Sequence, residues 1–96
     1  MELIIHPKAA RDVREIALGY ARASERVVGQ FWDEIDRAIE SIAKNPERHH
    51  IDLSGIRRCN LKRFPYHILF EERLDCLRII VVRHDHRHPS YGLRRR

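Results

Sequence analysis

The spacing of hydrophobic residues changes at Asn45-Pro46, and this change constrains the fold of the chain more than any other feature. Before this point, apolar residues recur three or four positions apart, which is the spacing of an amphipathic helix. After it, apolar and polar residues alternate, as they do on the two faces of a β-strand. Because both kinds of element must bury an apolar side, the sequence predicts an α+β fold in which helices pack on a sheet.

Two helices are predicted in the first half of the chain. The first runs from Lys8 to Ala21, and Pro7 suits its first turn because proline lacks the N–H that would have no partner there. The second runs from Ser24 to Lys44, with the Ser24 hydroxyl as its N-terminal cap. We expect them to form a hairpin, because each carries one apolar stripe. The stripe residues are Val13, Ile16, Ala17 and Tyr20 in the first helix and Val28, Phe31, Ile35, Ile39 and Ile42 in the second.

The strands predicted around this hairpin are Met1 to His6, Arg58 to Phe64, Tyr66 to Glu71 and Leu77 to Val82. The last is expected to be the most buried, because neither of its faces is polar. In the second strand, Cys59 and Leu61 are expected to point inward. The side chains predicted for its basic outer face are Arg58, Asn60 and Lys62. The order is then β-α-α-β-β-β, with the helical hairpin packed on one face of a small, mainly antiparallel sheet.

Length and composition limit the class of protein. We expect residues 1–96 to form a single domain, because 96 residues are too few for two independent cores. A hydrophobic content of 43% excludes a disordered chain, and no apolar run is long enough to span a membrane. The N-terminus lacks the apolar segment of a secretory signal, so we expect a cytoplasmic location. Cys59 and Cys76 lie in strand-like apolar runs, where we expect reduced thiols.

Positive charge is concentrated in the second half of the chain. Residues 1–56 carry 8 Lys and Arg residues against 10 Asp and Glu, whereas residues 57–96 carry 11 against 4. The formal net charge of +5 therefore combines a slightly acidic helical half with a strongly basic strand half. A polyanion is expected to bind to the basic half.

Several stretches of the strand half resemble signatures of a known family. These are Gly55-Ile56-Arg57-Arg58, Leu61-Lys62-Arg63-Phe64-Pro65-Tyr66-His67-Ile68, Val82-Arg83-His84 and Arg87-His88-Pro89-Ser90-Tyr91. Together with the element order, they resemble the RelE/ParE superfamily of toxins of type II toxin–antitoxin systems, which includes plasmid stabilisation proteins. The resemblance covers essentially the whole chain. It implies a bacterial toxin that is neutralised by a cognate antitoxin. One branch cleaves mRNA on the ribosome and another poisons DNA gyrase, so the fold alone does not choose between them.

Cleavage of RNA through its own 2′-hydroxyl requires a base, cations around the phosphate and an acid for the leaving oxygen, but neither a metal nor a cofactor. His84 has the best ordinary pKa for proton transfer, and Tyr91 can stack on a base or donate a proton. The residues predicted as catalytic are Arg63, Arg83, His84 and Tyr91, and those predicted to bind nucleic acid are Arg58, Lys62, Arg87 and Arg94. We expect these side chains to converge on one anion-binding patch.

Other interpretations remain open at this point. Arginines on an open sheet are often simply solvated or paired with acids. The alternating His84, His86 and His88 have a spacing that can bind a transition metal, but the interleaved Arg83 and Arg87 would repel the cation. The first hypothesis is therefore a toxin that acts as a metal-independent endoribonuclease on ribosome-bound mRNA. The alternatives are a non-enzymatic toxin that traps gyrase and a non-toxic nucleic-acid-binding module.

All three hypotheses share an expected partner. An exposed helical hairpin beside a basic sheet is suited to an antitoxin tail that lays an amphipathic helix along the hairpin. Acidic residues of the antitoxin would then face Arg58 and Lys62. A dimer, or a hetero-oligomer with the antitoxin, is compatible with this arrangement, and the further target is either ribosome-bound mRNA or DNA gyrase.

Overall fold

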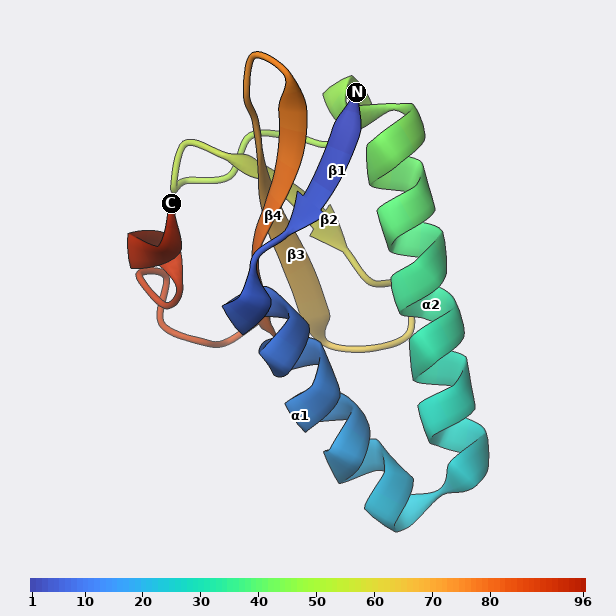
Figure 1. The fold of residues 1–96 in the computed structure, drawn as a ribbon. Coiled ribbons are helices and arrows are strands. Elements are labelled where there is room, and N and C mark those ends of the chain that lie inside the picture. The colour runs from blue at the N-terminus through green and yellow to red at the C-terminus, as the bar shows by residue number, and fades with distance from the viewer.

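The computed structural model describes residues 1–96 and has the predicted α+β architecture and element order (Figure 1). The strands are β1 (Glu2–Ile5), β2 (Arg57–Asn60), β3 (Tyr66–Glu72) and β4 (Cys76–His84), and the helices are α1 (Pro7–Ala23) and α2 (Glu25–Lys44). Two short 3₁₀ turns, η1 (Pro46–Arg48) and η2 (Leu93–Arg95), follow α2 and β4. The helix boundaries lie within two residues of those predicted.

A single residue, Ser24, joins the two helices. Its backbone N–H donates to the Tyr20 carbonyl at the end of α1, and its hydroxyl accepts the Val27 N–H at 3.2 Å at the start of α2. Because the same residue satisfies one helix end and caps the next, the chain turns sharply there. The helices diverge from this point as a V, and the sheet lies across its open end (Figure 1).

The four strands form one mixed sheet in the order β1-β4-β3-β2. Strand β1 runs parallel to β4, with Leu3 opposite Leu77, whereas the other neighbours are antiparallel. The prediction of a small, mainly antiparallel sheet is therefore confirmed. Strand β4 occupies an interior position, and most of its residues are buried on both faces, as its uninterrupted apolar run predicted.

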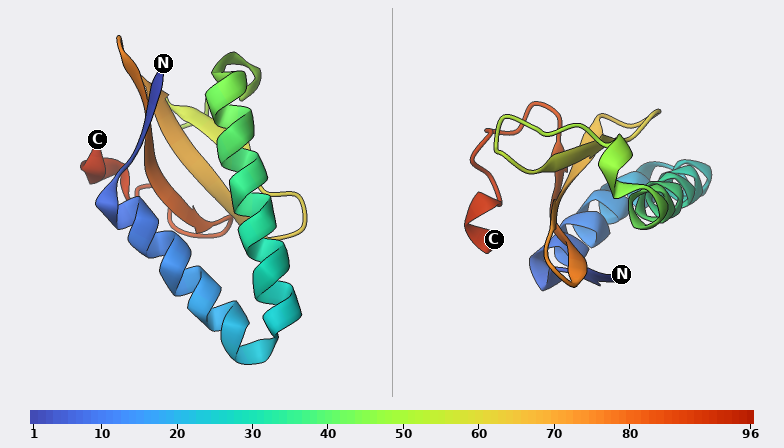
Figure 2. Two further views of the ribbon diagram at one scale, coloured as in Figure 1. Left: turned by 45° about the vertical axis from the view of Figure 1, so that its right-hand side comes forward. Right: turned by 90° about the horizontal axis from the view of Figure 1, so that it is seen from above.

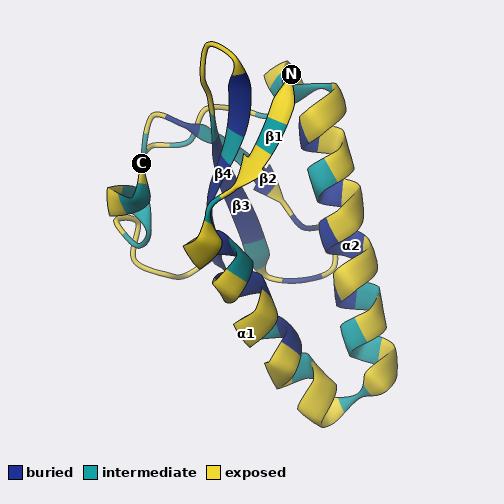
Figure 3. Ribbon diagram, in the orientation of Figure 1, coloured by how far each residue is buried: buried dark blue, intermediate teal, exposed yellow.

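The sheet is covered on both of its faces. Helices α1 and α2 pack on one face over the main core, which includes Phe31, Ile35, Ile68 and Phe70. The C-terminal segment, residues 85–96, crosses the opposite face, where Tyr91 and Leu93 pack on a smaller core (Figure 2). That core is formed by Ile56, Leu69, Ile80 and Val81. The buried positions of the two helices face the sheet, and the outer sides of the helices are exposed (Figure 3).

Strand β2 is shorter than predicted, because it ends at Asn60 rather than Phe64. The buried carboxylate of Glu34 on α2 accepts the backbone N–H groups of Lys62 and Arg63, so these residues pair with a helix side chain instead of a strand. Cys59 and Leu61 are buried as predicted. The prediction that Lys62 shares an outer face with Arg58 is wrong, because the strand has already ended.

The two cysteines are buried, and no helix of the chain is suited to cross a membrane. Cys59 and Cys76 are both free thiols and both buried. Burial raises the pKa of the Cys59 thiol, which keeps it protonated and apolar in character. Neither helix has the combination of length and apolar character needed to cross a membrane.

Candidate functional site

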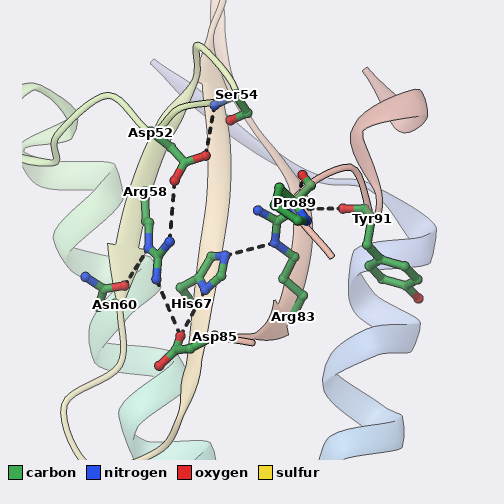
Figure 4. Close-up of polar contacts among 9 residues, drawn as sticks. All are labelled: Asp52, Ser54, Arg58, Asn60, His67, Arg83, Asp85, Pro89 and Tyr91. Carbon is green, nitrogen blue, oxygen red and sulfur yellow. Dashed lines mark hydrogen bonds and ion pairs between the residues drawn. The ribbon is translucent and has the colours of Figure 1, made fainter. Parts of the chain in front are cut away.

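Arg83, a predicted catalytic residue, is buried in the face of the sheet that the C-terminal segment covers. Its Nε donates to His67 Nε2 at 2.9 Å, and its Nη1 donates to the carbonyls of Pro89 at 2.8 Å and Tyr91 at 2.9 Å (Figure 4). Only 5% of the residue is exposed. Burial also lowers the pKa of the guanidinium from its ordinary value. Arg83 therefore fastens the C-terminal segment to β4 and β3.

His67 connects Arg83 to an acidic partner. An arginine can only donate hydrogen bonds, so His67 Nε2 must be the unprotonated, accepting nitrogen. The Nδ1 nitrogen then carries the proton and donates to Asp85 Oδ1 at 2.9 Å. Burial lowers the pKa of His67, and nearby Arg58 and Arg83 lower it further against the opposing effect of Asp85. The ring is therefore held neutral in one tautomer.

Arg58, predicted to bind nucleic acid, is also engaged within this network. Its Nη1 lies 3.4 Å from Asp52 Oδ1, its Nη2 lies 3.6 Å from Asp85 Oδ1, and its Nε donates to Asn60 Oδ1 at 2.7 Å (Figure 4). The Asp52 carboxylate also accepts the Ser54 N–H at 3.0 Å. The charge of Arg58 is thus largely balanced by neighbouring acids, which leaves little of it for a phosphate.

Three other predicted residues, together with Arg83, line a cleft of about 300 Å³ between α1 and the C-terminal segment. His84 Nδ1 accepts the His86 N–H at 3.0 Å, which leaves Nε2 without a protein partner, and its ring packs edge-on against Tyr66. The Arg87 guanidinium lies 4.1 Å from the centroid of the Tyr91 ring. The cleft therefore combines one imidazole, one accessible guanidinium and one phenol.

The remaining predicted residues lie elsewhere. Lys62 and Arg63 line a different groove beside α2, and Arg94 is exposed on the C-terminal turn η2. The eight residues are therefore divided among the covered sheet face, the cleft, the α2 groove and the terminal turn. The prediction of one convergent cationic patch is wrong, because the end of β2 at Asn60 directs Lys62 and Arg63 toward α2.

The alternating histidines do not build a metal centre with other ligands. No cluster of three or more His, Cys, Asp or Glu side chains in the chain has the geometry to hold a metal ion. His86 and His88 are exposed, and His88 Nδ1 instead lies 2.7 Å from the Ser90 hydroxyl.

An ion pair between Arg95 and Asp12 also holds the C-terminal segment, and the sequence analysis did not predict it. Arg95 Nη1 lies 2.6 Å from Asp12 Oδ2, and Arg95 Nη2 lies 3.2 Å from Asp12 Oδ1, so the pair is bidentate. Asp12 is buried on α1 and also accepts the Val82 N–H at 3.1 Å. An acidic residue on the inner side of an amphipathic helix was the only sequence signal for this ion pair.

An apolar groove of about 310 Å³ opens between the two helices where the V meets the sheet. Its walls come from α1, α2 and β1, and its floor comes from β3 and β4. Trp32 and Ile5 border it and are each 40% exposed, which is unusual for large apolar side chains. Its apolar lining includes Ile5, Val13, Trp32, Ile35 and Ile39.

Comparison with known proteins identifies the fold and the family. A solved structure described as "Chromosomal ParDE TA system from P. aeruginosa" superposes with a TM-score of 0.76, covering 88% of this chain and 95% of that chain at 18% sequence identity. The helical hairpin on a four-stranded mixed sheet is therefore a ParE-like fold. The family model described as "ParE toxin of type II toxin-antitoxin system, parDE" matches residues 3–89. The chain belongs to this toxin family, as the resemblance to the RelE/ParE superfamily predicted. No curated protein matches the sequence.

Proposed function

We propose that residues 1–96 act as one toxin domain that arrests growth by trapping DNA gyrase, without cleaving RNA. The observation that carries this proposal is the engagement of Arg83, whose guanidinium donates to His67, Pro89 and Tyr91. Cleavage of RNA would require cations that are free to bind a phosphate whose charge is growing. Binding to a protein target requires only a suitable surface, so membership of the ParE toxin family and the engaged arginine support the same conclusion.

Separation of the predicted catalytic residues supports the non-enzymatic action further. Arg63 lines the α2 groove, whereas Arg83, His84 and Tyr91 line the cleft beside α1. A general base and the cations that stabilise the transition state must lie within hydrogen-bonding reach of the same reacting group. Arg63 lies in a different groove from the other three residues and does not meet this requirement.

Ribosome-dependent mRNA cleavage is the second candidate function, and one observation favours it. The cleft holds His84 with a free Nε2, Arg87 and the Tyr91 hydroxyl, which are chemically able to supply a base, a cation and an acid. Cleavage of mRNA would require His84, whereas trapping of gyrase would not.

Expression in bacteria tests these alternatives. The chain is induced alone, and RNA integrity and the supercoiling of a reporter plasmid are followed at early times. We expect DNA damage signalling and altered supercoiling while mRNA stays intact. We also expect His84→Ala to keep its toxicity, with Arg11→Ala as a matched variant of an exposed residue on α1. Early mRNA fragmentation that disappears in His84→Ala would instead assign the RNA-cleaving function.

The apolar groove between the helices is the proposed site of a cognate antitoxin. An amphipathic helix would bury its apolar side against Trp32 and Ile39, which the isolated chain leaves partly exposed to water, above the buried Ile35. Exposed aromatic residues beside a pocket often supply most of the binding energy at an interface. The complex of toxin and antitoxin is then a hetero-oligomer.

Replacement of Trp32 tests the location of the antitoxin. We expect Trp32→Glu to remain toxic but to lose rescue by the co-expressed antitoxin, because a charge would be buried in the interface. Leu18→Glu is the matched control, since Leu18 is 57% exposed on α1 and does not line the groove. If both variants were rescued as well as the wild type, the antitoxin would bind elsewhere.

A further inference from the structure

A second groove, of about 440 Å³, lies between α2 and the edge strand β2, and it is lined by three cations that the proposed toxin action leaves unassigned. Arg37 projects from α2, and Lys62 and Arg63 project from the segment that follows β2. All three are exposed, and none takes part in the ion pairs of the structure. Their charges are therefore free to bind an anion.

Glu34 holds two of these cations in place. Its buried carboxylate accepts the backbone N–H of Lys62 and, at 2.9 Å, that of Arg63. Both hydrogen bonds involve a charged acceptor, which makes them stronger than neutral ones. The segment is thus fixed against α2, with Arg37 one helical turn from Glu34, and little backbone freedom would be lost when a ligand binds.

The groove has the charge and the donors of an anion site. Glu34 is the only acidic residue that lines it, and its Oε1 already accepts both backbone donors. Asn60, Ser41 and His49 add uncharged polar groups along the walls. Guanidinium groups bind phosphate oxygens in pairs, and a lysine ammonium adds a point charge, so this combination suits phosphate groups.

The edge of β2 offers little room for an acidic peptide strand. The Arg58 N–H on the open edge already donates to the His50 carbonyl at 2.9 Å, and Ile51 pairs with Arg57. The strand then ends at Asn60. Addition of a partner strand needs a longer row of unpaired backbone groups. A phosphodiester chain needs only the cations, so it is the better match.

We propose that this groove binds the phosphodiester backbone of duplex DNA. The choice of DNA over RNA rests on the proposed function, in which the toxin acts on gyrase while gyrase holds DNA. The binding itself depends only on Arg37, Lys62 and Arg63, and it occurs without gyrase.

Fluorescence anisotropy with a short labelled DNA duplex tests the proposal across a range of salt concentrations. The probe contains no gyrase, so the result is independent of whether gyrase is the target. We expect the variant Arg37→Gln/Lys62→Gln/Arg63→Gln to bind about tenfold or more weakly at low salt. Its plot of log affinity against log salt should be shallower by about 2.7, or about 0.9 for each lost phosphate contact.

A variant with the same loss of charge elsewhere is the control. Arg11→Gln/Arg22→Gln/Arg26→Gln removes three exposed arginines from the helical hairpin, none of which lines the groove. We expect it to change the affinity by less than about twofold. Equal weakening by both triple variants would overturn the proposal, because it would mean diffuse attraction. Failure of the wild-type chain to bind the duplex would also overturn it.

Two further measurements complete the test. A single-stranded RNA that bound more tightly than the duplex, or a glutamate-rich peptide that bound while the duplex did not, would reassign the groove and contradict the proposal. Thermal melting checks that the triple variant is folded. If it is not, Lys62→Gln replaces it, because it changes one exposed side chain and should make the salt dependence shallower by about 0.9.

Discussion

Only 5% of Arg83 is exposed, and its Nε and Nη1 make three hydrogen bonds within the protein. Two of its acceptors are the carbonyls of Pro89 and Tyr91, and a third is the imidazole of His67. Asp85 orients that imidazole from its other side. The chain Asp85–His67–Arg83 therefore positions the C-terminal segment through hydrogen bonds.

Replacement of Arg83 should cost more stability than replacement of its neighbour Arg87. Arg83→Ala leaves two carbonyls and the His67 Nε2 without donors in a buried region, so we expect it to lower the free energy of unfolding by about 3 kcal/mol. Arg87 is exposed, and Arg87→Ala should cost less than about 1 kcal/mol. Urea denaturation measures both values. Equal effects would mean that the Arg83 contacts contribute nothing specific.

Stability should fall as the solution becomes more acidic, in part because of His67. Burial lowers the pKa of His67 below its ordinary value of 6.5, so the unfolded chain takes up a proton that the folded chain excludes. The contribution of His67 to the free energy of unfolding is fully present above pH 6.5. It declines below that pH, until the folded state also binds the proton.

Thermal melting of the wild type and of His67→Gln, measured at several pH values, isolates this effect. Glutamine cannot titrate, so we expect the melting temperature of the variant to depend less on pH below 6.5. The pKa values of His6 and His49 are also lowered by burial, but both residues are present in both proteins, and the difference between the two proteins removes their contribution. If the melting temperatures of both proteins depended on pH in the same way, His67 would not contribute to the loss of stability in acid.

At the scale of elements, the C-terminal segment depends on a close approach at Gly92. This glycine has a positive φ of 84°, and a Cβ atom there would lie 2.6 Å from Val81 Cγ2. Gly92→Ala should therefore reduce the free energy of unfolding by about 2–4 kcal/mol through strain and overpacking. Gly19→Ala is the matched control on α1, where nothing lies within 4 Å of the added Cβ.

The control should have the opposite sign. Alanine is a better helix former than glycine, so we expect Gly19→Ala to stabilise the chain by about 0.5–1 kcal/mol. Chemical denaturation of both variants gives the comparison. If Gly92→Ala left the free energy of unfolding unchanged, the segment would not pack against β4 as closely as the structure indicates.

Elements with a local signal could be predicted from the sequence. Pro7 and Ser24 mark the helix starts because capping and the missing proline N–H act within one turn. The uninterrupted apolar run of β4 likewise identified an interior strand. The end of β2 could not be predicted in this way. It depends on Glu34, which is separated from Arg63 by 29 residues and contacts it only after folding.

The candidate site was harder to predict than the fold, for the same reason. Arg83 and Arg87 look alike in the sequence, yet one is buried under the C-terminal segment and the other is exposed. Their difference arises from how that segment folds back onto the sheet. An ion pair between Arg95 and Asp12, which are 83 residues apart in the sequence, helps to hold the segment there. Basic composition indicated a polyanion partner, but it carried no information on which cations are already engaged.

At the scale of the whole molecule, the surfaces proposed for different partners are separate. The apolar groove between the helices suits an antitoxin helix, whereas the cationic groove beside α2 suits DNA. The C-terminal segment closes the remaining face of the sheet (Figure 2). An antitoxin can therefore neutralise the toxin by covering the helical side, without direct competition for the phosphate-binding cations.

Supercoiling of relaxed plasmid by purified DNA gyrase, in the presence of this chain, distinguishes trapping of gyrase from cleavage of RNA. We expect that supercoiling stops and that gyrase-linked cleaved DNA accumulates, equally with the wild type and with His84→Ala, while mRNA in a translating extract stays whole. Normal supercoiling, together with discrete mRNA cleavage that requires His84, would contradict it.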